Sequence, residues 1–388
     1  MNKILNKISR AYWAYRNKIT NKLWGTAYVP AKGKRRGSVL ISYITEPFTL
    51  APWEKFSNFH TMYWECREIA LLFSERGYGC DIINTKDGKF IPKKPYVICI
   101  DAENDLERLA KYLPKNCKKV FHILISHWEA YNTAEQNRLD RLEQRRKVRL
   151  APRRKMSPTQ NAEVADFLEG FGNKTIFNTF AQFKKPIFFI PISAVVQFDF
   201  PEKKDWGNAR KHFLWVGGGG AVLKGLDMAL EAFAVMPDLH LHVCGPVYAE
   251  KDFVEAYKKE LEEAPNIHVY GRIDVGEKQF ADIVDKCSAL VYPSGGEGSS
   301  GAVVQAMHAG LVPIITHETG IQEDSEYIAL ENPTPESIAK TVKDFSNTPP
   351  EKIRLKAHSI WEYARTNYTR KTFSTAYARF IDEVLKLK

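Results

Sequence analysis

Short apolar segments alternate with helix-like segments along the chain, and this alternation limits the possible fold more than any other feature. Strand-like runs occupy residues 38–44, 79–85, 96–102 and 120–126, and helix-like runs occupy 56–76, 106–113, 133–146 and 159–171. Continuous apolar strands separated by helices are typical of a parallel sheet that is covered by helices on both faces.

The alternation restarts beyond residue 203. Strand-like runs then occupy 212–218, 239–245, 266–271, 288–294 and 311–316, with helix-like runs at 225–236, 251–263, 278–287 and 301–310. A chain of 388 residues is long enough for two domains of ordinary size. We therefore expect an α/β fold with two doubly wound, Rossmann-like domains that face a central cleft. Ligands of such domains bind beyond the carboxyl ends of the strands.

The net charge of +10 belongs to one end of the chain. Residues 1–36 contain ten Lys or Arg and no acidic residue, whereas the remaining chain has 46 basic and 46 acidic residues. The folded part is therefore neutral overall. We expect no nucleic-acid partner, because a basic surface on the fold would be needed to bind one.

The first 24 residues have the pattern of a basic amphipathic helix. Apolar side chains recur at three- and four-residue steps, basic side chains fall elsewhere, and two tryptophans add rings that suit a headgroup layer. The apolar set is Ile4, Leu5, Ile8, Tyr12, Tyr15, Ile19 and Leu23, the basic set is Lys3, Lys7, Arg10 and Lys18, and the tryptophans are Trp13 and Trp24.

Such a helix is predicted to lie in the plane of an anionic membrane. The alternatives are a helix that packs on its own domain and a cleaved targeting segment, although the pattern of a secretory signal is missing. Residues 29–37 are interpreted as a basic linker. No run of about 18 apolar residues is present, so a membrane-spanning helix is not expected.

The six cysteines show no C-x-x-C pair and no histidine at metal-ligand spacing. Most lie in apolar runs, where a free thiol behaves as a small hydrophobic side chain. They are interpreted as reduced core residues of a cytosolic protein.

Two glycine-rich turns in the second half follow strands and precede helices. The first, "WVGGGGAVLKGLD", has bare backbone at Gly217, Gly218 and Gly219, and places Lys224 where it can meet an anion. It lacks the G-K-[ST] ending of a P-loop and the spacing of a dinucleotide fingerprint. A plain tight turn is the alternative interpretation.

The second turn, "VYPSGGEGSSGAVVQAM", places Glu297 just ahead of a helix. The amides of Ser299, Ser300 and Gly301 are expected to be unpaired donors of a first helical turn, which attract phosphate. A carboxylate beside phosphate is favourable only if it binds something neutral, and sugar hydroxyls donate strongly to carboxylates. The alternative is an acidic residue that simply stabilises the helix N-terminus.

Two further strands, "HVCG" and "HVYGRI", end in glycine. They are expected to leave room for a planar base near Gly245 and near Gly271, Arg272 and Ile273. Sites for a phosphate, a sugar and a base together indicate a sugar nucleotide.

Residues 211–320 resemble the donor domain of the retaining glycosyltransferases of family four, which have the GT-B fold. The segments that carry this resemblance are "FLWVGGGGAVLKGLDMALEAF", "LHLHVCG", "NIHVYGRI" and "VYPSGGEGSSGAVVQAMHAGLVPIIT", with weaker similarity at "FHILISHWEAYN" and at the C-terminal run. The resemblance implies that the last helix crosses back to the first domain.

The resemblance also implies roles for individual residues. Lys224 matches the lysine that binds the diphosphate, and Glu297 matches the first glutamate of a paired motif that contacts the transferred sugar. Gly298 to Gly301 match the segment that cradles sugar and phosphate. His127 matches a histidine that faces the donor from the first domain, although a structural residue at a strand end is the alternative.

Two positions depart from the family pattern. The arginine that usually precedes the lysine is absent from "GGGGAVL", and the second glutamate is replaced by Gln305, which can still bond a ribose hydroxyl. The chain contains no D-x-D pair, and the resemblance likewise implies no metal. Charge on the departing diphosphate is then expected to be stabilised by Lys224 and by helix amides.

Seven of the eleven residues from 145 to 155 are basic. One interpretation is a site for a phosphorylated lipid acceptor or for the membrane surface, and the other is a solvated helix end and loop. The arginines concerned are Arg145, Arg146, Arg149, Arg153 and Arg154.

The sequence therefore predicts a metal-independent retaining glycosyltransferase on the cytoplasmic face of the cell membrane. It would move a sugar from a nucleotide-diphosphate sugar to a lipid-linked or polysaccharide acceptor. The alternative is a catalytically weak scaffold subunit that binds sugar nucleotides. The expected parts are a helix and linker (1–36), an acceptor domain (37–203), a donor domain (204–366) and a crossing helix (367–388).

Overall fold

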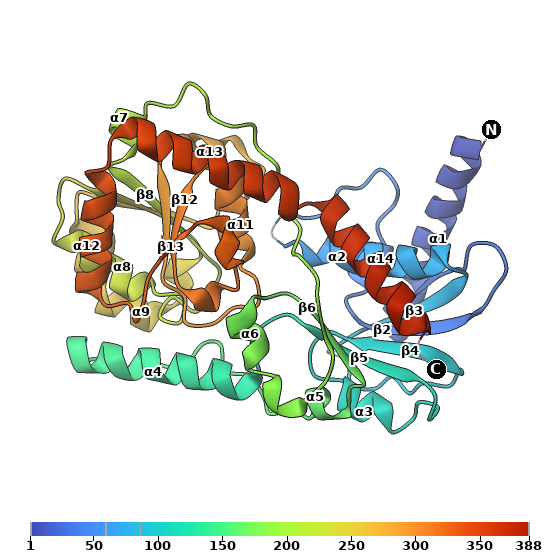
Figure 1. The fold of residues 1–388 in the computed structure, drawn as a ribbon. Helices are drawn as coiled ribbons and strands as arrows, with labels where there is room; N and C mark the ends of the chain where they lie inside the picture. Colours follow the sequence, from blue (N-terminus) through green and yellow to red (C-terminus); the bar gives the residue numbers. More distant parts are fainter. Residues whose placement is uncertain (1, 59, 86, 387–388) are drawn as a thin grey trace.

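A computed structural model describes residues 2–58, 60–85 and 87–386, with the side chains of residues 2–7 outside this description. The predicted roles of Lys3, Ile4, Leu5 and Lys7 therefore lie outside the described side chains. The chain forms two sheets, each covered by helices on both faces (Figure 1). This arrangement confirms the predicted pair of Rossmann-like domains.

The first domain is built on a seven-stranded sheet with the strand order β1-β3-β2-β4-β5-β6-β7. All neighbouring pairs are parallel except β1 and β3. Its strands are β1 (Thr26–Val29), β2 (Gly37–Tyr43), β3 (Tyr78–Asn84), β4 (Tyr96–Asp101), β5 (Lys118–Ile123), β6 (Phe167–Gly170) and β7 (Ile187–Phe189). Its helices are α2 (Met62–Glu75), α3 (Leu106–Ala110), α4 (Trp128–Arg146), α5 (Asn161–Val164) and α6 (Lys174–Asn178).

The second domain has a six-stranded parallel sheet with the order β10-β9-β8-β11-β12-β13. Its strands are β8 (His212–Val216), β9 (His240–Cys244), β10 (Ile267–Gly271), β11 (Ala289–Tyr292), β12 (Val312–Ile315) and β13 (Ile328–Ala329). Its helices are α7 (Trp206–Ala209), α8 (Leu226–Ala234), α9 (Lys251–Ala256), α10 (Lys278–Lys286), α11 (Gly301–His308), α12 (Pro335–Ser346) and α13 (Pro350–Asn367).

One predicted helix is wrong. Residues 159–171 form only the short helix α5, and the next residues form strand β6, which pairs in parallel with β5. The strand is stabilised by its interior contacts: the buried carboxylate of Glu169 accepts hydrogen bonds from Tyr377 (2.8 Å) and meets His122 Nδ1 (2.8 Å). These partners lie far away in the sequence, so the local pattern does not reveal them.

The last helix, α14 (Arg370–Lys386), leaves the second domain and packs on α2 of the first (Figure 1). Tyr377 of α14 is fully buried, and Asp382 of the same helix forms an ion pair with Arg76 of the first domain at 2.7 Å. α13 and α14 together tie the two domains to each other.

Helix α1 (Asn2–Trp24) is fixed to the first sheet by its polar side. Asn17 is 3% exposed, and its side-chain amide bonds both the N–H (2.9 Å) and the carbonyl (3.1 Å) of Tyr28 in β1. Residues 26–29 form the edge strand of the first sheet and α1 packs beside it, an arrangement that the sequence pattern does not indicate. Within the described ranges, no helix combines the length and apolar composition needed to cross a bilayer.

Four histidines stack across β8, β9 and β10. His212 Nδ1 lies 3.0 Å from His242 Nε2, and His240 Nδ1 lies 3.2 Å from His268 Nε2. Burial, and then the neighbouring imidazoles, lower the pKa of His242 to about 3 and that of His212 to about 4. The rings of His242 and His212 are therefore neutral in the folded protein at physiological pH.

We predict that this stack makes the fold sensitive to acid. Because the pKa of His242 is about 3 in the folded state and about 6.5 in the unfolded chain, the unfolded chain binds more protons between these values. Stability therefore falls as the pH falls below about 6.5, by about 2 kcal/mol from His242 alone at pH ~5.

Urea unfolding of the wild type and of His242→Gln at pH ~7.5 and pH ~5 measures this effect. The loss on acidification should be about 2 kcal/mol smaller in the variant. An unchanged pH dependence in His242→Gln would contradict the prediction.

Candidate functional site

Lys224 and Glu297 form an ion pair where the two glycine-rich turns of the second domain meet. Lys224 Nζ lies 2.5 Å from Glu297 Oε1, and both side chains are largely buried, at 11% and 14% exposure. Tyr292 at the end of β11 joins them: its hydroxyl donates to Glu297 Oε1 (2.8 Å) and accepts from Lys224 Nζ (2.9 Å). The structure therefore brings the two principal predicted residues into direct contact.

The pKa of Glu297 reflects this contact. Burial alone would raise it, but the charge and hydrogen bond of Lys224, the Tyr292 hydroxyl and the more distant Arg154 together lower it below its usual range. Glu297 is therefore ionised at neutral pH. A carboxylate in this state accepts hydrogen bonds strongly from a ligand.

The first glycine-rich turn is partly open and partly filled. A Cβ on Gly218 would meet nothing within 4 Å, whereas one on Gly217 would lie 2.8 Å from the Trp215 ring. Glu250 accepts hydrogen bonds from the amides of Gly220 (2.6 Å) and Ala221 (3.2 Å). A ligand therefore finds open backbone at Gly218 and Gly219, while the next two amides already bind a carboxylate.

The second turn touches the first domain. Ile125 forms a β-bridge with Gly298, and the Ser126 amide donates to the Glu297 carbonyl at 3.2 Å. The Ser300 amide donates to the Thr319 carbonyl (2.8 Å), so the prediction that it is an unpaired donor is wrong. The structure gives no such partner to the amides of Ser299 and Gly301 within the described residues.

Gln305 has a structural role that the sequence does not predict. It is 3% exposed, its Nε2 donates to the Val196 carbonyl (2.7 Å), and its Oε1 accepts from the Val196 amide (3.1 Å). Both ends of the side chain are thus used to fix the segment that connects the two domains. The predicted bond to a ribose hydroxyl would require these bonds to break.

The predicted base site is only partly open. A Cβ on Gly245 would lie 2.6 Å from the Gly217 carbonyl, so neighbouring backbone fills that side. Gly271 has a φ of +74° and nothing near its Cβ position. Arg272 and Ile273 follow it directly, which leaves the end of β10 as the open part of this region.

His127 caps α4 inside an aromatic group formed by Trp128, Phe180 and Phe183. Burial lowers its pKa, and the charged groups that act on it are Glu129 and Glu163 of the first domain. Among the described residues, its amide donates to Thr179 (2.9 Å) and its ring lies 3.8 Å from Glu129, and no hydrogen bond or ion pair joins it to Lys224 or Glu297.

A second histidine, His60, lies near enough to the pair for the charges of Glu297 and Lys224 to affect its pKa, and the sequence does not single it out. It precedes α2, and its Nδ1 accepts the Met62 amide at 3.2 Å. Burial lowers its pKa, with smaller effects from Glu297, which raises it, and from Lys224 and Arg154, which lower it. The His60 side chain is exposed, and among the described residues no hydrogen bond joins it to Lys224 or Glu297.

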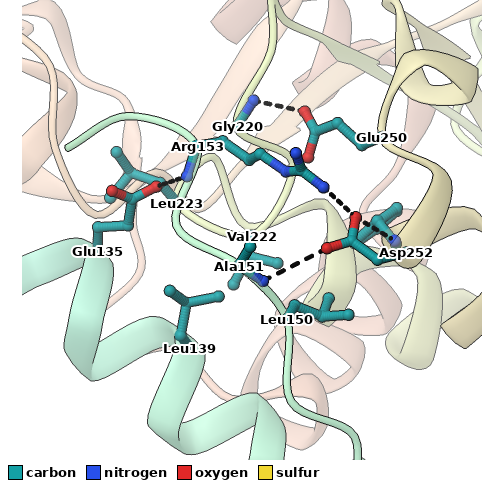
Figure 2. Close-up of a pocket in the computed structure, with 11 residues that line it drawn as sticks. Glu135, Leu139, Leu150, Ala151, Arg153, Gly220, Val222, Leu223, Glu250 and Asp252 are labelled. Atoms are coloured by element: carbon teal, nitrogen blue, oxygen red, sulfur yellow. Dashed lines mark hydrogen bonds and ion pairs between the residues drawn. The ribbon is translucent and has the colours of Figure 1, made fainter.

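The basic stretch 145–155 forms the end of α4 and an exposed loop, and part of it is ion-paired to the second domain. α4 lies along the second domain (Figure 1), and three of the arginines bind acidic side chains of that domain, of which Figure 2 shows Arg153 with Asp252. Arg145 bonds Asp227 (2.6 Å) and Glu231 (3.0 Å), Arg146 bonds Glu260 (2.7 Å), and Arg153 bonds Asp252. Arg149 is exposed, and Arg154 lies beside Gly220.

Figure 2 shows a pocket at this junction between α4 and the first glycine-rich turn. Glu135 and Leu139 line it from α4, and Gly220, Glu250 and Asp252 line it from the second domain. Among the residues that the structure describes, no three His, Cys, Asp or Glu side chains are grouped as a metal site.

We predict that Gln305→Glu will destabilise the protein and will not raise its activity. The substitution replaces the Nε2 donor with an oxygen and turns a buried charge toward the Val196 carbonyl. The free energy of unfolding should fall by about 2–4 kcal/mol. Gln144→Glu, on the exposed side of α4, is the matched control and should change it by less than about 0.5 kcal/mol. Wild-type stability with faster turnover in Gln305→Glu would contradict the structural role.

The second domain also matches a known protein family in sequence. Residues 210–347 match the family Glycosyl transferases group 1. Comparison with curated protein sequences gives no match.

Several solved structures are similar to the chain at low sequence identity. Sucrose-phosphate synthase (tll1590) from Thermosynechococcus elongatus has a TM-score of 0.60 and 12% identity, with 91% of this chain and 100% of that chain covered. WaaG, a glycosyltransferase involved in lipopolysaccharide biosynthesis, has a TM-score of 0.55 and 13% identity, with coverage of 89% and 99%. Anabaena Alr3699/HepE in complex with UDP-glucose has a TM-score of 0.55 and 10% identity, with coverage of 89% and 99%.

The chain spans 54% of the length of TarM, which it matches with a TM-score of 0.52 and 13% identity over 73% of its own residues. These similarities show the fold, which is the GT-B fold predicted from the sequence. Together with the family match over residues 210–347, they support a GT-B glycosyltransferase.

Proposed function

We propose that the chain is a retaining glycosyltransferase that uses a nucleotide-diphosphate sugar as donor and a lipid-linked or polysaccharide glycan as acceptor. The observation that carries the proposal is the buried Lys224–Glu297 pair between two glycine-rich turns. It supplies a cation for the diphosphate and an ionised carboxylate for sugar hydroxyls within one site. WaaG is involved in lipopolysaccharide biosynthesis and HepE binds UDP-glucose in its solved structure, which supports the same classes of acceptor and donor.

In this proposal the donor separates the pair. The diphosphate takes Lys224, and hydroxyls of the sugar take Glu297, so each partner exchanges one strong contact for another. As the bond to the sugar breaks, negative charge grows on the diphosphate, and Lys224 and the amides at the start of α11 stabilise it. Retention of configuration, suggested by the sequence resemblance, would follow from attack on the same face of the sugar.

The proposed reaction needs no metal. The positive charge that would stabilise the leaving diphosphate comes from Lys224, and the sequence contains no D-x-D pair to hold a divalent ion beside it.

A thermal-shift screen with UDP-, GDP- and ADP-sugars tests the donor class. A ligand present at 100 times its Kd stabilises a protein by about 2.7 kcal/mol, which raises Tm measurably. We expect at least one sugar nucleotide to do so, and to release its nucleoside diphosphate when a lipid-linked glycan is added. No stabilisation by any of them would contradict the proposal, and stabilisation without turnover would favour the scaffold alternative.

We also propose that α1 binds the inner face of the cell membrane. One side of the helix packs on β1, and the apolar side chains on the other side lie in solvent. The exposed fractions of these side chains range from 44% to 69%, and the residues are Ile8, Tyr12, Tyr15, Ile19, Leu23 and Trp24. A stripe of this kind on a helix flanked by basic residues matches an anionic lipid surface. Since Asn17 ties the helix to the sheet, the helix would hold the body at a fixed angle to the membrane.

We predict that Ile8→Ser with Tyr15→Ser will weaken binding to vesicles that contain phosphatidylserine by at least about tenfold, because both side chains would be buried in lipid. These substitutions leave β1 intact, whereas deletion of residues 1–36 would remove it. Tyr112→Ser, at a tyrosine 50% exposed on the first domain, is the control and should bind as the wild type does. Co-sedimentation measures binding, and equal binding by the double variant would exclude α1 as the anchor.

A further inference from the structure

Arg154 of the first domain crosses the first glycine-rich turn of the second. A Cβ on Gly220 would lie 2.5 Å from Arg154 Cγ and 3.1 Å from its Cδ. Gly220 also has a φ of +90°, a conformation that other residues rarely adopt. Only glycine at this position therefore allows both the turn and the close approach of the arginine.

Two side chains of α4, one buried and one half-buried, bind the backbone of the loop that carries Arg154. Glu135 is 3% exposed, and its Oε1 accepts the amides of Arg153 (2.7 Å) and Arg154 (2.8 Å). Asn132 forms two hydrogen bonds with the backbone of Met156, at 2.8 and 2.9 Å. Because its backbone is fixed on both sides, Arg154 is presented in one place.

The Arg154 side chain then points into the charged site. Its Nε donates to the Tyr131 hydroxyl at 3.2 Å, and the Tyr131 ring packs against Gly296, one residue before Glu297. Burial would lower the pKa of Arg154, but Tyr131 and the negative charge of Glu297 raise it above its usual range. Arg154 and the Lys224–Glu297 pair are therefore parts of one electrostatic group.

Arg154 differs from three neighbouring arginines in having no carboxylate partner among the described residues. Arg145, Arg146 and Arg153 each have a carboxylate of the second domain within ion-pair distance. Among the described residues, Arg154 has no carboxylate at that distance, and it is exposed to solvent. Lys224 is already balanced by Glu297. Arg138 beside Gly295 also has no carboxylate within ion-pair distance among the described residues, but it is buried and donates to the Pro293 carbonyl (3.0 Å). Arg154 is thus the more accessible of these two cations without an anion of their own.

We propose that Arg154 binds the diphosphate of the donor, so that a residue of the first domain completes the anion site of the second. This inference rests on the proposed function. A nucleoside diphosphate carries more negative charge than Lys224 alone can balance, and a guanidinium presents paired N–H donors that suit phosphate oxygens. Gly218 and Gly219 leave open backbone next to it. Donor binding would then also hold the two domains together.

Calorimetry on the full chain tests the proposal. The probes are UDP, GDP and ADP and the matching nucleosides, which lack phosphate. Arg154→Ala should weaken binding of the preferred diphosphate by about 10- to 100-fold, as expected for the loss of a charged hydrogen-bonding partner. Nucleoside binding and the Tm of the free protein should change little, and Arg154→Lys should recover part of the affinity.

Arg153→Ala is the matched control, since it removes the same charge from the next residue of the same loop. Arg153 is bound to Asp252, so its loss should weaken diphosphate binding by less than about threefold. Equal affinities of the Arg154→Ala and Arg153→Ala proteins would overturn the role of Arg154 while leaving the proposed function in place. An equal loss of nucleoside and diphosphate binding in Arg154→Ala would also overturn it. A wild-type protein that binds none of the three diphosphates would contradict both proposals.

Discussion

The contact between Lys224 Nζ and Glu297 Oε1 organises the site, because it holds two opposite charges in a region from which most water is excluded. Two buried charges are stable there only if each has good partners, and removal of one typically costs several kcal/mol because the other is left unpaired. Tyr292 bonds both and limits this cost. A ligand that offers an anion to one partner and hydroxyls to the other can replace the pair without leaving either charge bare.

Several contacts hold the two domains to each other around this ion pair. α4 leaves the first domain and is ion-paired along the second through Arg145 and Arg146, while α14 returns from the second domain to α2. The end of β5 continues to Ile125, which bridges Gly298. The backbone of one domain thus reaches the turn that carries Glu297. A site assembled in this way has contributions from both domains, although all the predicted donor-site residues except His127 lie in the second.

The sequence predicts the parts of the site that are built locally. Lys224 and Glu297 follow strand–turn–helix segments, and parallel strands place such turns at one edge of the sheet. Tyr131 and Arg154 have no such pattern, because they reach the site through contacts between segments that are distant in the chain. Gln305 illustrates the same limit, since its partner Val196 is 109 positions away. β6 resembles a helix in sequence and becomes a strand because β5, His122 and Tyr377 surround Glu169.

The most direct test is to compare binding of a nucleoside diphosphate and of its sugar nucleotide to Glu297→Gln, Lys224→Ala and the double variant by calorimetry. Glu297→Gln should bind the bare diphosphate at least as tightly as the wild type, because Lys224 is released, and should bind the sugar nucleotide more weakly. Lys224→Ala should weaken both, and the double variant should recover part of the diphosphate affinity. Equal losses for the two ligands in Glu297→Gln would show that the carboxylate does not serve the sugar.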